Sequence, residues 1–187
     1  IFLIIPLCQA ALFVIIRGVK LKDALWKYCI SSQILSLMIE EGQAKYPKET
    51  GGILIGWQKE HVFYIETAIG PGPNAFHKDL GFKRDGDFSQ SQLDSVVFKT
   101  RGQWDYIGEW HSHPRNMGPS STDIASLRKV QTSPKFNILQ PILGLIINTG
   151  SEWHFHCYLL SQNRLLIEIP RQEADMNNNC KEVTTFS

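Results

Sequence analysis

The apolar residues of this chain recur with two different periods, and the first period predicts helices. Apolar positions return every three or four residues in three stretches, which is typical of helices that cover a core with one face. The first stretch follows Ser31, a suitable N-cap, and cannot continue past Pro47. The other two cover 88–99 and 120–130, and the last of these opens on serines that can also cap a helix.

The second period predicts strands. Apolar or alternating runs bounded by turn residues occur at 51–57, 62–69, 104–110, 141–147 and 153–160, with a shorter run at 165–169. The polar turn 58–61 joins the first two runs as a hairpin. Because strands and helices interleave, the sequence predicts an α/β fold with a central mixed β-sheet flanked by helices.

The length and the two ends of the chain predict one folded domain with a segment on either side. The 187 residues fit a single domain, which we expect over 19–171, and the polar residues 172–187 are expected to form a flexible tail. Residues 1–18 are almost wholly apolar but shorter than a usual membrane anchor, and they lack the features of a secretory signal. Three interpretations of this segment stay open: a membrane or signal role, a fragment of a longer protein, or a translation extended upstream of a start near Val19.

Charge and cysteine content exclude several classes of function. The chain carries 19 basic and 18 acidic residues, so no uniform field would attract nucleic acid or an anionic membrane. The four cysteines lie far apart, which predicts neither a zinc knuckle nor a dense disulfide framework, and we expect a cytoplasmic location. The absence of a Cys-x-x-Cys pair also argues against a zinc nucleoside deaminase.

One His-x-His pair has the surroundings of a metal site. His111 and His113 would project from the same face of a strand, and Pro114 ends that strand. Asp123 lies at the start of the next predicted helix, from which it can return as a third ligand. Two imidazoles and one carboxylate leave a position open for water, the usual arrangement of a catalytic zinc, so we expect one Zn²⁺ per chain.

A second pair with the same spacing is interpreted differently. His154 and His156 lie on another predicted strand, and no third ligand follows them, so ordinary sheet residues are the favoured interpretation. Glu109 shares the parity of the first pair and is a candidate for orienting an imidazole. The five tryptophans are expected to pack in the core or a groove, and His61 and His77 are interpreted as surface or loop residues without a chemical role.

Two separated motifs resemble those of the JAB/MPN (JAMM) metalloproteases. Residues 49–56, ETGGILIG, resemble their opening motif, and residues 108–114, GEWHSHP, continued to Asp123, resemble their metal motif. The resemblance implies a single JAB/MPN-type, cytidine-deaminase-like domain with Glu49 as general base and acid. It also implies that His111, His113 and Asp123 bind zinc and that Ser120 stabilises the oxyanion.

The loop before that serine departs from the family pattern. The family usually has seven residues between its second metal-binding histidine and the serine, whereas residues 114–119 number six here. Ser121 is the competing assignment for the oxyanion donor.

The short chain and its two motifs look most like stand-alone bacterial members of the family, and especially like the deconjugating proteases encoded in CBASS antiphage operons. That resemblance implies a protein conjugate as substrate, joined through the C-terminus of a ubiquitin-like carrier or of a nucleotidyltransferase. Trimming of a ubiquitin-like sulfur carrier and a non-catalytic MPN scaffold are the alternatives, although all the metal ligands are present.

Overall fold

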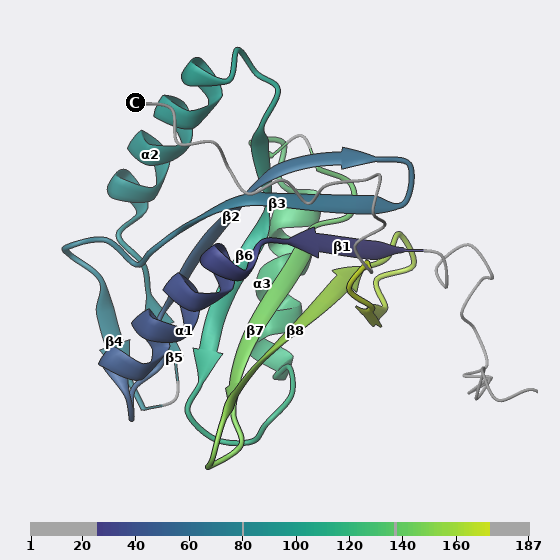
Figure 1. The fold of residues 1–187 in the computed structure, drawn as a ribbon. Coiled ribbons are helices and arrows are strands. Elements are labelled where there is room, and N and C mark those ends of the chain that lie inside the picture. Colours follow the sequence, from purple (N-terminus) through teal and green to yellow (C-terminus); the bar gives the residue numbers. More distant parts are fainter. Residues whose placement is uncertain (1–25, 80, 137, 173–187) are drawn as a thin grey trace, which may run out of the picture.

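A seven-stranded sheet carries helices on both faces in the computed structural model, which describes residues 26–79, 81–136 and 138–172 (Figure 1). The strands of the sheet lie in the order β1-β3-β2-β6-β7-β8-β9, and β4 and β5 form a separate two-stranded sheet. Along the chain the elements are β1 (Lys27–Ile30), α1 (Ser32–Lys45), β2 (Gly51–Lys59), β3 (Val62–Ile69), β4 (Phe76–Lys78), β5 (Gly81–Lys83), α2 (Gly86–Lys99), β6 (Asp105–His113), α3 (Ser121–Thr132), β7 (Ile142–Asn148), β8 (Trp153–Leu160) and β9 (Leu166–Ile169).

The order of the strands decides where the ends of β6 and α3 meet. β2 is antiparallel to both β3 and β6, whereas β7 is parallel to β6. Parallel neighbours need a crossover connection, and α3 supplies it. The N-terminus of α3 therefore follows closely on the C-terminal end of β6, with only residues 114–120 between them.

Each face of the sheet has its own apolar layer. On one face, α1 packs through Ile34 and Met38 into a cluster that includes Leu54 and Trp110. On the other face, Leu127 of α3 packs against alternate residues of β7, while α2 and the end of α3 cover β2 and β6. Figure 1 shows α1 in front of the sheet and α3 behind it. β7 is buried on both faces, which explains its continuous apolar sequence.

The predicted mixed α/β fold is confirmed, and the elements differ from expectation mainly at their ends. α2 begins at Gly86 rather than Phe88, because the Asp85 side chain accepts a hydrogen bond from the Phe88 N–H and caps the helix. β6 begins at Asp105 rather than Trp104 and ends at His113, directly before Pro114, where the strand was expected to end. β1 and the β4–β5 hairpin were not predicted.

The predicted terminal segments fall where the structure gives no description. The apolar segment 1–18 and nearly all of the tail 172–187 lie outside the described residues. Within the described ranges, no helix is both long and apolar enough to cross a membrane.

Candidate metal centre and active site

Strand β6 presents its two histidines to the face of the sheet that α3 covers. His111 and His113 are both buried, and the intervening Ser112 points to the opposite face. His111 lies opposite Leu145 of β7, whose side chain belongs to the apolar layer beneath α3. The alternation expected from the sequence therefore places both imidazoles on one side.

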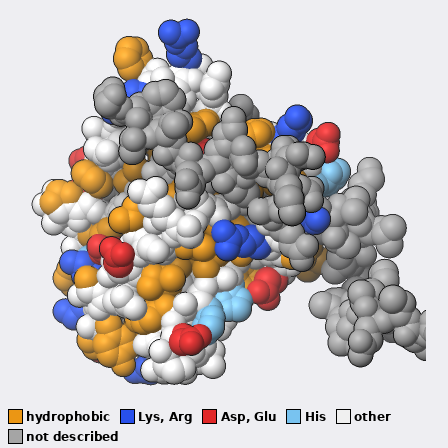
Figure 2. Space-filling view, in the orientation of Figure 1, with side chains coloured by type: hydrophobic (Ala, Val, Ile, Leu, Met, Phe, Trp, Pro, Cys, Tyr) orange, Lys and Arg blue, Asp and Glu red, His pale blue; other side chains and the backbone are white. Residues whose placement is uncertain are grey.

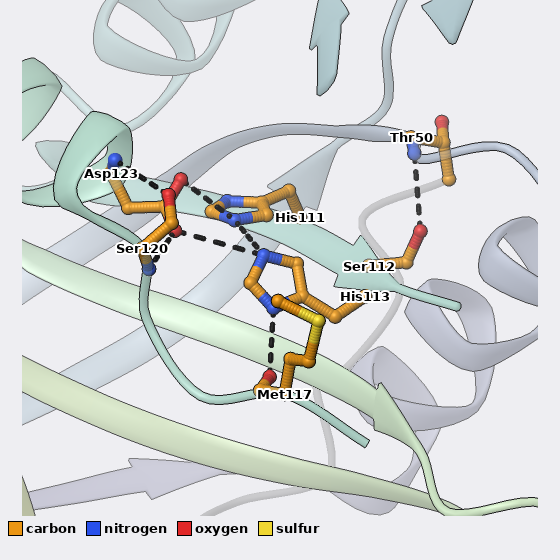
Figure 3. A network of polar contacts seen from close by, with 7 residues as sticks. All are labelled: Thr50, His111, Ser112, His113, Met117, Ser120 and Asp123. Carbon is orange, nitrogen blue, oxygen red and sulfur yellow. Dashed lines mark hydrogen bonds and ion pairs between the residues drawn. The ribbon is translucent and has the colours of Figure 1, made fainter. Parts of the chain in front are cut away.

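The first turn of α3 brings the third candidate ligand. Ser120 is the N-cap, and its Oγ accepts a hydrogen bond from the Asp123 N–H at 3.2 Å. In return, the Ser120 N–H donates to Asp123 Oδ2 at 2.6 Å, which completes a capping box (Figure 3). This reciprocal pair fixes the carboxylate of Asp123 over the ends of the two imidazoles.

The three side chains have the spacing of a tetrahedral metal site. The Nε2 atoms of His111 and His113 are 3.0 Å apart, and they lie 3.2 Å and 3.6 Å from the Oδ1 and Oδ2 atoms of Asp123. Zinc bonds of about 2.0–2.1 Å at tetrahedral angles separate ligand atoms by about 3.3–3.4 Å. His111, His113 and Asp123 are therefore close enough together to hold a single metal ion.

The surroundings favour the protonation states that metal ligands need. Burial lowers the pKa of His113, and the adjacent His111 lowers it further. Burial alone raises the pKa of Asp123, but the hydrogen bond and charge of His111, with hydrogen bonds from Ser120, hold that pKa well below its ordinary value. A neutral imidazole and an ionised carboxylate are the forms that bind a metal.

The loop between β6 and α3 orients one of the imidazoles. The Nδ1 atom of His113 lies 2.8 Å from the carbonyl oxygen of Met117, and because a carbonyl can only accept, Nδ1 carries the proton (Figure 3). The Nε2 lone pair is then directed at the metal position. Glu109, the partner suggested by its parity, instead forms an ion pair with Arg84 at 2.6 Å.

Glu49 stands beside the histidines because β2 is joined closely to β6. The Thr50 N–H donates to Ser112 Oγ at 3.1 Å, and the Ser112 N–H donates to the Thr50 carbonyl oxygen at 2.7 Å. The next residue, Gly51, has no room for a side chain, since a Cβ there would lie 2.2 Å from the Trp110 carbonyl oxygen. Thr50, which lies between Glu49 and β2, is thereby held against β6, the strand that bears the candidate ligands.

The side chain of Glu49 is half-buried and electrostatically coupled to the candidate ligands. Burial raises the pKa of its carboxyl group above the ordinary value. His111 opposes this shift, Asp123 adds to it, and a hydrogen bond from the Gly81 N–H lowers the pKa. A carboxyl group whose pKa is raised is better matched to proton transfer near neutral pH.

Two hollows meet at this constellation. A pocket of about 210 Å³ lies on the side of the β6–α3 loop, and a groove of about 420 Å³ lies on the side of β5 and the start of α2. Glu49, Gly81, Thr122 and Asp123 line both. Of the two candidate oxyanion donors, Ser120 lines the pocket, whereas Ser121 is exposed on the helix.

The second His-x-His pair has different contacts. His154 faces Glu152 at 3.5 Å, and His156 contacts Glu168 at 2.8 Å, so each imidazole has its own carboxylate at the surface. Figure 2 shows histidine and acidic side chains next to one another on one face of the molecule, among scattered basic and apolar groups. The described residues offer no third ligand to this pair.

Several residues around the site were not found from the sequence. His77, interpreted as lacking a chemical role, lies on β4 with its Nδ1 atom 2.9 Å from the Glu49 carbonyl oxygen. Met117 contributes only its backbone, which any residue type could supply. Arg84, the partner of Glu109, lies 25 residues before it in sequence, and only the fold brings the two together.

Two buried imidazoles with one carboxylate, open to a groove, fit the donor set of a catalytic metal site that keeps a free coordination position. The family profile described as "Prokaryotic homologs of the JAB domain" matches residues 31–162, and the chain belongs to this family. The resemblance seen in the two motifs is thereby confirmed. The match includes Glu49, Ser120 and the three candidate ligands.

Relatives of the chain carry related names. The chain is 30% identical over 145 residues to "Probable metalloprotease y4qB" of Sinorhizobium fredii, covering 74% of this chain and 88% of the relative. It is 30% identical over 128 residues to a "CD-NTase/cGAS isopeptidase" of Escherichia coli, covering 66% and 78%. A solved structure, of protein DSY2949 from Desulfitobacterium hafniense, matches at 18% identity with a TM-score of 0.49, covering 80% of this chain and 97% of that one, a level that says nothing about function.

Proposed function

We propose that this chain is a zinc-dependent peptidase or isopeptidase that hydrolyses the amide between a carrier protein's C-terminus and its target. The observation that carries the proposal is the triangle of His111, His113 and Asp123, with Glu49 beside it, at the meeting point of two hollows. A scissile amide has chain on both of its sides, and a site that opens in two directions accommodates both.

His111, His113 and Asp123 would hold the metal as two neutral nitrogens and one carboxylate oxygen. Zinc bound there would supply Lewis-acid chemistry, activating water and polarising the carbonyl oxygen of the substrate. Zinc is the preferred identity because nitrogen and oxygen donors at tetrahedral spacing suit it. Met117 keeps the His113 tautomer that such binding requires.

Glu49 is assigned the proton transfers. Its half-buried carboxylate would accept a proton from the attacking water and return it to the leaving amine nitrogen, as the C–N bond breaks and a carboxylate forms. One residue can perform both transfers, because acceptance of the first proton prepares it for donation of the second.

Ser120 is assigned the stabilisation of the oxyanion. Its Oγ accepts the Asp123 N–H with a lone pair, so the hydroxyl proton stays available to donate into the pocket that Ser120 lines. A donor directed at the developing charge stabilises a tetrahedral intermediate by about 3–4 kcal/mol in well-studied hydrolases.

The names of the relatives guide the choice of substrate. Matched proteins of Escherichia coli, Enterobacter hormaechei and Vibrio cholerae are named CD-NTase/cGAS isopeptidases. We propose a nucleotidyltransferase conjugate, cleaved as part of bacterial antiphage defence, as the preferred substrate of this chain. A ubiquitin-like carrier conjugate would use the same chemistry.

The test is a cleavage assay with matched conjugates. Purified protein is incubated with a nucleotidyltransferase joined through its C-terminus to a lysine, with a ubiquitin-like carrier conjugate, and with a sulfur carrier bearing a C-terminal extension. We expect cleavage of the first, loss of cleavage on chelation and recovery on addition of zinc. Cleavage of the sulfur carrier alone would replace the proposed substrate, and metal-independent or absent cleavage of all three would contradict the proposed function.

A further inference from the structure

The β4–β5 hairpin contacts three different groups of Glu49. Glu49 lies in the short connection between α1 and β2, next to Thr50, which is paired with Ser112 of β6. Its N–H donates to the Lys78 carbonyl oxygen at 2.9 Å, and its carbonyl oxygen accepts from His77 Nδ1 at 2.9 Å. Its carboxylate accepts a hydrogen bond from the Gly81 N–H. The backbone and the side chain of Glu49 are therefore both held by this hairpin.

The same hairpin also reaches the candidate metal ligands. Phe82 lies opposite His77 in the hairpin register, and their rings stack at 6.3 Å with an interplanar angle of 16°. The Phe82 ring also lies 6.4 Å from the His111 ring. A row of three rings thus connects the residue that binds the Glu49 carbonyl with one of the ligands.

The hairpin is not part of the main sheet; hydrogen bonds close its base, and one ion pair joins it to β6. The Asp85 N–H donates to the Pro71 carbonyl oxygen at 2.8 Å, and the Asp85 carboxylate accepts two hydrogen bonds from Asn74. The ion pair between Arg84 and Glu109 joins the end of the hairpin to β6, two residues before His111. The hairpin is consequently anchored to the strand that carries the ligands.

We propose that the β4–β5 hairpin positions Glu49 for proton transfer and that His77 is the positioning residue that joins the two. This inference rests on the proposed function, because it assigns Glu49 the proton transfers. His77 serves through two features: its Nδ1–H donates to the Glu49 carbonyl, and its ring stacks on Phe82. Displacement of a catalytic group by about 1 Å can cost a factor of about 100 in rate.

The variants are chosen to separate the two features of His77. His77→Phe keeps a ring to stack on Phe82 but cannot donate a hydrogen bond. His77→Asn supplies an amide N–H near the position of Nδ1 and serves as the conservative variant. His156→Phe is the matched control, since His156 also lies on a strand and also uses Nδ1 in a polar contact, but with Glu168 at the surface.

In a conjugate cleavage assay of zinc-loaded protein, we expect His77→Phe to lower kcat about 10- to 100-fold with KM and zinc content nearly unchanged. His77→Asn should recover most of the loss, and His156→Phe should match the wild type. An equal loss in all three variants, or a His77→Phe effect confined to KM or to zinc content, would overturn the positioning role.

Amide hydrogen exchange supplies a readout that does not depend on activity. In ¹⁵N-labelled His77→Phe protein, the Glu49 and Gly81 amides should exchange at least about tenfold faster than in the wild type, while β6 amides keep their protection. Unchanged exchange at Glu49 and Gly81 would contradict the proposal. If the wild type cleaved no conjugate, the proposed function would fail, and the exchange data would still decide whether the hairpin holds Glu49.

Discussion

The two His-x-His pairs of this protein share a sheet face but have different surroundings. In the register of the sheet, His111 lies opposite Leu145, and Leu145 lies opposite His156, so β7 alone separates the pairs. The first pair is 9% and 7% exposed at its side chains, whereas the second is 46% and 36% exposed. Both pairs have the same spacing of two residues, so this spacing alone cannot distinguish a metal site from ordinary sheet residues.

The difference comes from what approaches each pair. The capped first turn of α3 brings Asp123 within 3.6 Å of both imidazoles of the first pair. Each histidine of the second pair faces a separate carboxylate, from Glu152 and Glu168, which pulls the two imidazoles toward different partners. A shared third ligand, rather than the pair itself, defines the candidate metal centre.

Removal of one histidine from each pair should separate them most strongly. We expect His113→Ala to lower zinc affinity at least about 100-fold and to abolish cleavage, because loss of a ligand exceeds the effect of losing a ligand's hydrogen-bond partner. His156→Ala should retain both. Zinc content by mass spectrometry after dialysis, with the cleavage assay, measures the contrast, and equal losses would remove the distinction.

Substitutions of Ser120 test whether the cap that brings Asp123 to the first pair also serves the reaction. Ser120→Ala removes the hydroxyl, and we expect kcat to fall about 100- to 1,000-fold and the free energy of unfolding to fall by about 1 kcal/mol. Ser120→Thr keeps a hydroxyl in both roles and should stay close to the wild type. If the Ser120→Ala protein is destabilised but fully active, Ser120 caps α3 but does not stabilise the oxyanion.

The first pair lies on β6, and β2 approaches β6 closely beside that pair, at Gly51. A methyl group at Gly51 would meet the Trp110 carbonyl oxygen and the His111 side chain, so we expect Gly51→Ala to lower the free energy of unfolding by about 1–3 kcal/mol. Gly70→Ala is the matched control, because nothing lies within 4 Å of a Cβ there. Urea denaturation measures both, and similar stabilities would contradict the packing described for Gly51.

The smallest effect is expected at the base of the hairpin beside the first pair. Hydrogen bonds from the Phe88 N–H and from Asn74 lower the pKa of Asp85 from 3.8. Because the pKa of Asp85 is lower in the folded protein than in the unfolded chain, its ionised form stabilises the fold above the unfolded pKa. This stability is lost as the pH falls through the folded pKa. The melting temperature of wild type should exceed that of Asp85→Asn at about pH 6, and the gap should narrow by about pH 2.5. A gap independent of pH would exclude this contribution.

The sequence predicts the candidate ligand set, which the structure brings together, because its residues are close together in the chain. His111 and His113 belong to one strand, and Asp123 follows after a short loop and a helix start. Strand alternation and helix capping are local rules, and they suffice to place these three side chains. Glu49 is distant in sequence, and only the family resemblance associates it with the histidines.

The hairpin that holds Glu49 escapes sequence analysis for a physical reason. β4 and β5 have three residues each and lie mostly at the surface, so no apolar period marks them. Asp79 and Gly81, which adopts a φ of 122° at the start of β5, are the turn residues that could indicate a hairpin between 76 and 83. β1 is similarly short, and its burial comes from pairing with β3 and contact with residues after β9.

The most direct test of the account compares wild type with Glu49→Gln in zinc content and conjugate cleavage, measured on the same folded preparations. The substitution keeps size and hydrogen bonding but removes the carboxylate that would transfer protons. We predict one zinc per chain in both proteins and a loss of cleavage of at least about 100-fold in Glu49→Gln. A folded, zinc-loaded Glu49→Gln protein that cleaves as fast as wild type would contradict the account.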